Sequence, residues 1–119
     1  MKIERLATAF STAILIGTTL LLAGTGIASA ADEGAARGLA RQSNCFKCHS
    51  VDKKKEGPAW RDVAAKYRDK PDAEAKLTKH VTSGEKVKFE DGHEEDHAIV
   101  KSTDPKEIKN LVDWILSLH

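Results

Sequence analysis

The feature that most restricts how this sequence can fold is its pair of cysteines, Cys45 and Cys48, the only two in 119 residues. Just two residues separate them. A disulfide that closes so short a loop removes little conformational entropy from the unfolded chain, so it would add little stability. A chain built around this pair therefore needs another source of stability.

The first thirty residues have the pattern of an export signal. Lys2 and Arg5 carry positive charge at the start, an apolar stretch follows, and Ala28-Ser29-Ala30 supplies the small residues of a cleavage site. This pattern predicts a secretory signal peptide over residues 1–30 that is removed by cleavage. The alternative is an uncleaved anchor, because residues 6–31 are long enough to span a bilayer.

The remaining 89 residues, 31–119, are expected to form one small domain whose composition limits both its partners and its core. Without the signal the chain has 17 acidic and 17 basic side chains, so no basic surface for nucleic acid is expected. Aromatic residues make up only 5% of the sequence. Domains of this size are marginally stable on a core alone, and small exported domains usually add disulfides, a metal or a cofactor.

The spacing of apolar residues predicts an all-helical domain. The last helix is the clearest, because Asp104 can cap it, Pro105 takes its first position, and apolar residues then recur on one face. Three further helices are expected, over residues 32–44, 60–67 and 72–83. Between the third and the last helix, residues 84–103 are expected to form a polar loop with a short extended piece at 87–89.

The two cysteines belong to the motif Cys45-Phe46-Lys47-Cys48-His49, the C-x-x-C-H pattern of covalent c-type haem attachment. With this spacing the thiols can reach the two vinyl groups on one edge of the porphyrin, while the next residue brings its imidazole to the iron. A haem would also fill the small core. The other interpretations are a redox-active dithiol, a zinc site or a plain disulfide. The first normally occurs in a βαβ setting and the second needs four ligands, neither of which the sequence offers.

Two segments besides this motif resemble those of the small bacterial class I cytochromes c. They are Gly57-Pro58-Ala59-Trp60, shortly after the motif, and Leu111 to Ser117 in the last predicted helix. The resemblance extends from about Arg37 to Leu118. It implies an all-α class I cytochrome c fold, with about four helices wrapped around one covalent haem c.

The resemblance also implies roles for individual residues. Cys45 and Cys48 would form the thioether bonds, and His49 would be the proximal iron ligand. The carbonyl of Pro58 would accept a hydrogen bond from the other ring nitrogen of that histidine, which fixes its tautomer.

Three more residues receive expectations from the same resemblance. Gly38 would allow the first helix to approach the last one closely. Trp60 and Trp114 would pack near the haem edge or its propionates, the alternative being that they are ordinary core residues.

The sequence departs from the family pattern at the sixth iron position. Members of this type usually bind there through a methionine in the loop before the last helix, but the chain's single methionine is Met1. Counting back from Trp114 makes His97 the nearest donor and His93 the second, with a lysine, water or an open position as the remaining alternatives. His80, on the third predicted helix, is expected at the surface or near a propionate.

His93 to His97 also matches H-E-x-x-H, which on a helix would hold zinc with Glu94 as a general base. A metalloprotease needs a third ligand and a cleft as well, and a domain of 89 residues built around a haem has little room for them. Six-coordinate iron with fixed ligands reorganises little on gaining an electron, and the sequence arranges no substrate base or nucleophile beside it, so we expect an electron carrier and not an enzyme.

These observations together predict a periplasmic electron-transfer protein with one covalent haem, ligated by two histidines and low in reduction potential. Its partners would be periplasmic or membrane-bound redox proteins met transiently, with no nucleic acid, and with a membrane only if the signal remains as an anchor. The alternative function is a haem protein whose distal ligand is labile and opens a site for a diatomic gas or peroxide, as in a sensor or accessory enzyme.

Overall fold

The structure, a computed structural model, describes residues 29–119. The predicted signal peptide lies outside these residues apart from its last two, so its cleavage stays a prediction. None of the helices in the described part of the chain has the length and hydropathy that a membrane span requires.

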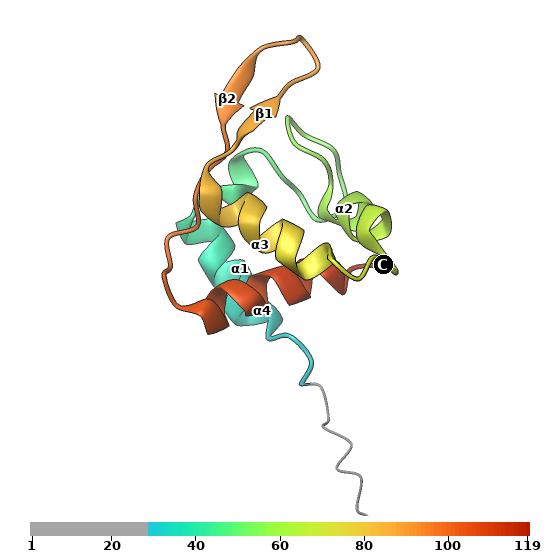
Figure 1. The fold of residues 1–119 in the computed structure, drawn as a ribbon, viewed down its shortest axis with the longest axis vertical. Helices are drawn as coiled ribbons and strands as arrows, with labels where there is room; N and C mark the ends of the chain where they lie inside the picture. Colours follow the sequence, from blue (N-terminus) through green and yellow to red (C-terminus); the bar gives the residue numbers. More distant parts are fainter. Residues whose placement is uncertain (1–28) are drawn as a thin grey trace, which may run out of the picture.

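Four α-helices form the domain, as the apolar spacing predicts (Figure 1). A short 3₁₀ helix, Cys45–Lys47, follows the first of them. The four are α1 (Glu33–Gln42), α2 (Trp60–Tyr67), α3 (Ala73–Ser83) and α4 (Pro105–Leu116). The first helix ends two residues earlier than expected, because Asn44 adopts a left-handed conformation with φ 59° and redirects the chain into the cysteine motif.

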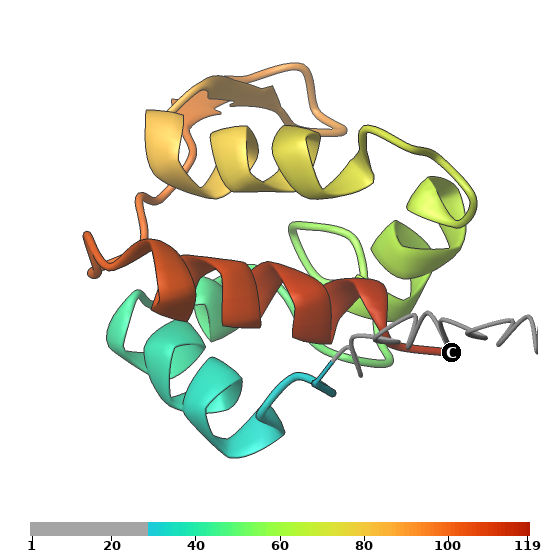
Figure 2. The same cartoon turned by 60° about the horizontal axis from the view of Figure 1, so that its bottom comes forward.

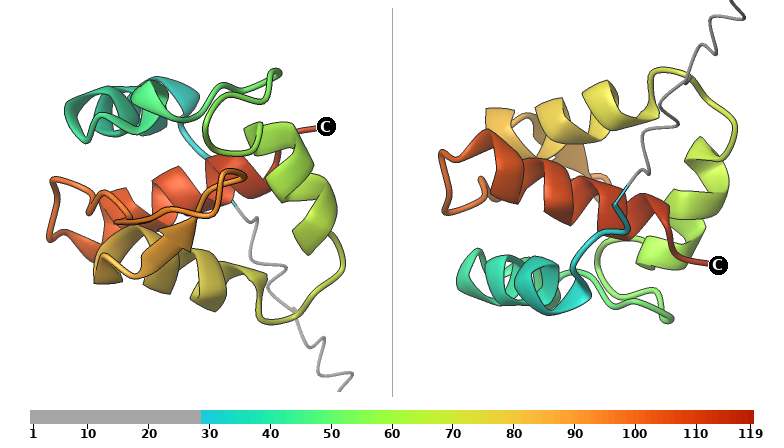
Figure 3. Two further views of the ribbon diagram at one scale, coloured as in Figure 1. Left: turned by 90° about the horizontal axis from the view of Figure 1, so that it is seen from above. Right: turned by 90° about the horizontal axis from the view of Figure 1, so that it is seen from below.

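Helix α4 is the central element, and the other three helices pack around it. Figures 2 and 3 show it lying between α1 on one side and α3 on the other. Its amphipathic sequence explains this position, since Leu111, Val112, Trp114 and Ile115 are all buried on one face. At its start, the side chain of Asp104 accepts a hydrogen bond from the backbone N–H of Lys106 and caps the helix.

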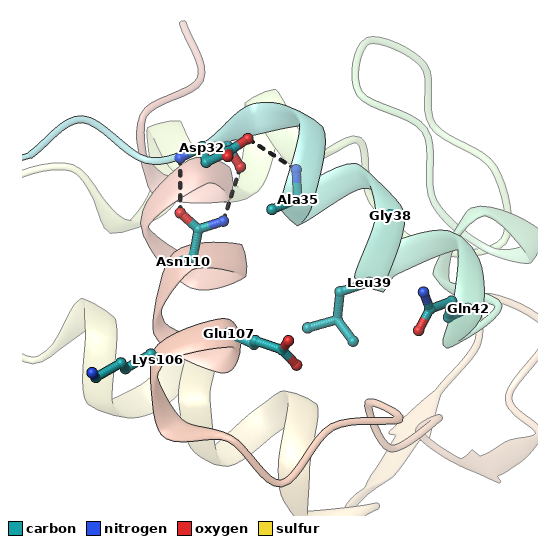
Figure 4. A pocket seen from close by; sticks show the side chains of 8 residues that line it. All are labelled: Asp32, Ala35, Gly38, Leu39, Gln42, Lys106, Glu107 and Asn110. Carbon is teal, nitrogen blue, oxygen red and sulfur yellow. Dashed lines mark hydrogen bonds between the residues drawn. The ribbon is translucent and has the colours of Figure 1, made fainter.

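The first turn of α1 is fastened to α4 by one side chain (Figure 4). Asn110 of α4 accepts a hydrogen bond from the backbone N–H of Asp32 and donates one to its carbonyl oxygen, both at 2.8 Å. A shallow groove runs between the two helices here, and Gly38 lines it. A Cβ atom on Gly38 would meet nothing within 4 Å. The expectation that this glycine permits a close helix approach is therefore wrong.

The segment between α3 and α4 contains more regular structure than a polar loop. Strands β1 (Lys86–Lys88) and β2 (Glu94–Asp96) pair antiparallel, with Val87 opposite Glu95. Each strand has three residues, which is too short for an alternating pattern to reveal. The two strands are stabilised by pairs of side chains that face each other across the hairpin. Lys86 and Asp96, for example, form an ion pair at 2.9 Å.

The tip of this hairpin holds His93 away from the body of the domain. Its ring stacks on Phe89 with 4.3 Å between ring centroids. Its Nδ1 pairs with the carboxylate of Asp91, and its Nε2 lies 3.4 Å from a carboxylate oxygen of Glu95. An ion pair between Glu90 and Lys54 joins the hairpin to the loop that precedes α2.

Replacement of Leu111 by alanine tests the central role of α4. The side chain is 1% exposed, so its loss is expected to lower the free energy of unfolding by about 2–5 kcal/mol. Chemical denaturation of the holoprotein measures this. Ile99→Ala is the matched control, because Ile99 is 54% exposed and its truncation should change stability by less than about 0.5 kcal/mol. Equal effects of the two changes would contradict the packing described.

The ring of His93 should titrate above its ordinary pKa of 6.5, because its hydrogen bond to Asp91 raises that pKa. The stabilisation from the ion pair is then fully present below the unfolded-state pKa and is lost as pH rises through the folded-state value. NMR titration of the ring protons measures the midpoint. Asp91→Asn should lower it, whereas a His93 bound to iron would show no such titration.

Candidate functional site

A cavity of about 740 Å³ lies in the interior, bounded by all the elements except α1. Its volume is within the range of roughly 300–1,000 Å³ that is typical of small-molecule and cofactor sites. Both cysteines and three histidines face it, together with apolar side chains from α2, α3, α4 and β1. The cavity lining includes Cys45, Cys48, His49, Trp60, Tyr67, Leu77, His80, Val81, Val87, Phe89, His97, Ala98, Leu111 and Ile115.

The cysteine motif is held in a tight turn at one wall of the cavity. The carbonyl oxygen of Cys45 accepts hydrogen bonds from the backbone N–H groups of Cys48 and His49, at 3.3 and 3.0 Å. This turn places both thiols and the imidazole on the cavity wall. Both thiols are free.

The two thiols differ in their surroundings. Burial raises the pKa of Cys45, which is the more deeply placed of the two. The pKa of Cys48 is raised by desolvation and then by its hydrogen bond to Glu56, whose carboxylate lies 3.6 Å from the sulfur. Cys48 therefore marks the more exposed edge of the cavity.

The His49 imidazole is fixed by the segment that follows the motif. Its Nδ1 donates a hydrogen bond of 2.7 Å to the carbonyl oxygen of Pro58, which leaves Nε2 as the unprotonated, metal-binding nitrogen. Gly57 passes so close to the ring that a Cβ atom there would lie 2.6 Å from ring carbon Cε1. Burial lowers the pKa of His49, so the ring is neutral at neutral pH.

His97 faces His49 across the cavity, with 6.1 Å between the two ring centroids. Two imidazoles that bind one metal ion from opposite sides have centroids about 6 Å apart, because each metal–nitrogen bond is about 2 Å and each nitrogen lies about 1 Å from its ring centre. His97 is half-buried, and burial lowers its pKa. Its Nδ1 is a buried polar atom without a hydrogen-bond partner among the described residues.

The two tryptophans expected near the haem differ in their relation to the cavity. Trp60 lines the cavity and stacks on His49, with ring centroids 5.6 Å apart. Trp114 is buried but is not part of the cavity wall; it packs edge-on against Trp60 and beneath the guanidinium of Arg37. Trp114 therefore supports Trp60 from the core side of the cavity wall.

His93 is not brought to the cavity either, because the hairpin carries it to the tip described above. The H-E-x-x-H pattern belongs to strand β2 and its flanks and not to a helix, so its two histidines do not share a helical face. Within residues 29–119, no three side chains of histidine, cysteine, aspartate or glutamate lie close enough together to hold a metal ion.

His80 is partly exposed, as expected, but it also belongs to the cavity wall. Its ring lines the cavity and lies 4.0 Å from that of His97, centroid to centroid. The available signal was helical spacing, because His80 follows Leu77 by three residues and precedes Val81, and both of these apolar residues line the same cavity.

The residues around the cavity fit a covalent haem. Two free thiols and an imidazole with a fixed tautomer lie on one wall, and the half-buried imidazole of His97 lies opposite. Apolar side chains from α2, α3, α4 and the hairpin line the rest. When bound, a haem supplies an iron centre that gains and loses one electron.

Comparisons with known proteins agree with this chemistry. The cytochrome c family model matches residues 33–119. Cytochrome c-551 of Pseudomonas denitrificans is 39% identical over 80 residues, which cover 67% of this chain and 93% of that protein. Cytochrome c-552 of Nitrosomonas europaea is also 39% identical over 80 residues, 67% of this chain and 75% of the relative.

Two solved structures have the same fold. The class 1 cytochrome MtoD of Sideroxydans lithotrophicus is 64% identical, with a TM-score of 0.71 over 75% of this chain and 98% of the other. Cytochrome c552 of Nitrosomonas europaea is 35% identical, with a TM-score of 0.57 over 70% and 99%. The chain therefore belongs to the cytochrome c family, and is a small class I electron carrier, not an enzyme, with one covalent c-type haem.

Proposed function

We propose that this protein is a periplasmic electron carrier of low reduction potential, whose iron is ligated by His49 and His97. The observation that carries the proposal is the 6.1 Å separation of these two rings across a cavity that both cysteines line. Nδ1 of His49 donates a hydrogen bond to the carbonyl oxygen of Pro58, which leaves Nε2 for the iron. His97 lies in the segment before the last helix, where members of this type usually have the methionine that binds the iron.

The replacement of a methionine by His97 determines the direction of the potential. A thioether is a weak, soft donor that favours ferrous iron and raises the potential, whereas an imidazole donates more strongly and favours ferric iron. The pKa values of His49 and His97 are both lowered by burial, so both rings are neutral and able to donate at neutral pH. The ligand pair therefore favours a low potential.

The acidic hairpin adds less to this effect than its sequence suggests. Five of the seven residues from 90 to 96 are acidic. Four of them already have a partner within the protein: Glu90 pairs with Lys54, Asp96 with Lys86, and Asp91 and Glu95 with His93. Solvent screens these exposed groups further. The ligand change is thus the main basis for a low potential.

Other redox proteins are the partners of a carrier of this family. We propose that these are periplasmic or membrane-bound and are met transiently, because the export signal predicted over residues 1–30 would deliver the chain to the periplasm. The more exposed edge of the site, at Cys48, is the natural place for electrons to enter and leave.

Replacement of His97 by alanine tests the distal ligand. The ferric holoprotein should change from a low-spin, six-coordinate optical spectrum to one with an open or water-bound position. His93→Ala is the matched control and should leave the spectrum unchanged, because His93 lies at the hairpin tip. The assignment of His97 would be wrong if its removal left the coordination intact.

Carbon monoxide binding to the unmodified protein and to His97→Ala distinguishes an electron carrier from a haem protein with a labile distal ligand. A firmly bound His97 should keep the unmodified ferrous protein from binding carbon monoxide rapidly near neutral pH, and His97→Ala should bind it rapidly. Rapid binding to the unmodified protein would favour the gas or peroxide function.

An equilibrium redox titration of the unmodified protein and of His97→Met tests the low potential. Restoring a thioether should raise the potential by about 0.1 V or more, within the roughly 0.8 V over which axial ligands set haem potentials. His93→Met serves as the control and should not change it. A His97→Met protein with the unmodified potential would contradict the proposal.

A further inference from the structure

A third histidine ring lies directly against that of His97. His80 extends from α3 into the same cavity, and the centroids of the two rings are 4.0 Å apart with an angle of 43° between their planes. The side chain of His80 is 33% exposed, so one part of the ring reaches solvent while the rest contacts the site. At this distance the ring of His97 cannot rotate freely without meeting that of His80.

The His80 ring is itself held by Glu85. Its Nδ1 lies 2.7 Å from a carboxylate oxygen of Glu85, and this hydrogen bond lowers the pKa of the carboxyl group. An ionised carboxylate only accepts hydrogen bonds, so Nδ1 of His80 is the donor. The pairing therefore fixes both the tautomer and the plane of the His80 ring.

Glu85 also holds the backbone of His97. Its carbonyl oxygen accepts a hydrogen bond of 3.0 Å from the backbone N–H of His97. Gly84 ends α3 in a left-handed conformation with φ 64°, and this turn precedes Glu85 directly. One residue thus connects to His97 in two ways, through its backbone to the His97 backbone and through its side chain to the neighbouring ring.

The His97 ring lacks the support that His49 has. His49 is oriented by its hydrogen bond to Pro58, whereas Nδ1 of His97 is buried without a partner in the described part of the chain. Metal-bound histidines are normally oriented by a hydrogen bond from the second ring nitrogen. Contact with His80, the nearer of the two rings that pair with His97, is a restraint that the structure offers in place of that bond.

We propose that His80, held by Glu85, is a positioning residue that sets the orientation of the His97 ring toward the iron. The proposal rests on the proposed function, since it requires that His97 is the distal ligand. It assigns to His80 and Glu85 a role that an axial methionine would not need, because a thioether has no ring plane to orient.

The test uses the haem-loaded protein and four single substitutions. His80→Ala removes the contact with His97, and Glu85→Ala removes the hydrogen bond that holds His80. Glu85→Gln keeps an oxygen that accepts the same bond, and so should restore the unmodified behaviour. All three leave the backbone hydrogen bond from Glu85 to His97 in place. His93→Ala, the change of an exposed histidine outside the cavity, is the control.

Two readouts report on the ring and not on folding. The g-values of the ferric protein in electron paramagnetic resonance depend on the angle between the two imidazole planes, and the rate of cyanide binding to ferric protein reports how readily the distal ligand leaves. His80→Ala should shift the g-values and raise the cyanide rate about tenfold or more, the usual scale for losing a partner of a metal-bound histidine. Glu85→Ala should change both in the same direction.

Each outcome decides between defined alternatives. Unmodified g-values and rates in both His80→Ala and Glu85→Ala would overturn the positioning role, even when His97→Ala loses its sixth ligand as expected. An unchanged low-spin spectrum in His97→Ala would instead overturn the proposed function. Loss of the sixth ligand in His80→Ala, with its retention in His97→Ala, would show that His80 is the ligand itself.

Discussion

The hydrogen bond from His49 to the carbonyl oxygen of Pro58 determines the chemistry of the whole cavity. It directs Nε2 of the imidazole toward a metal, and it is possible only because Gly57 leaves room for the ring. The tight turn at Cys45 keeps both thiols on the same wall. Once that wall is fixed, the opposite wall decides what kind of cytochrome the protein is, and there the structure places a second imidazole.

The small core is organised to surround this cavity. Helix α4 packs against the other three helices and provides Leu111 and Ile115 to the cavity wall, so the same face serves both core and site. A chain of this size gains much of its buried apolar contact from the covalent cofactor, which explains how so few aromatic residues suffice. Trp60 also belongs to both the core and the site, since it stacks on His49 and contacts Trp114.

Much of the fold could be predicted because the decisive signals are local. Pro105 and the apolar face of the last helix, and the C-x-x-C-H motif itself, depend on residues near one another in the sequence. The hairpin could not be predicted, because its strands are three residues long and are stabilised by cross-strand pairs such as Lys86 with Asp96. Gly38 was misinterpreted because the distance between two helices is not encoded in either one alone.

The site was predictable in its motif and less so in its surroundings. Spacing singled out His97, but it could not reveal that His80 and Glu85 would come together beside it, since that depends on how α3 ends at Gly84. The central claim is that His49 and His97 bind the iron from opposite sides. A crystal structure of the haem-loaded protein tests it most directly: the account predicts iron bonded to one ring nitrogen of each histidine. A water, a lysine or His80 in the sixth position, with the His97 ring turned away, would contradict it.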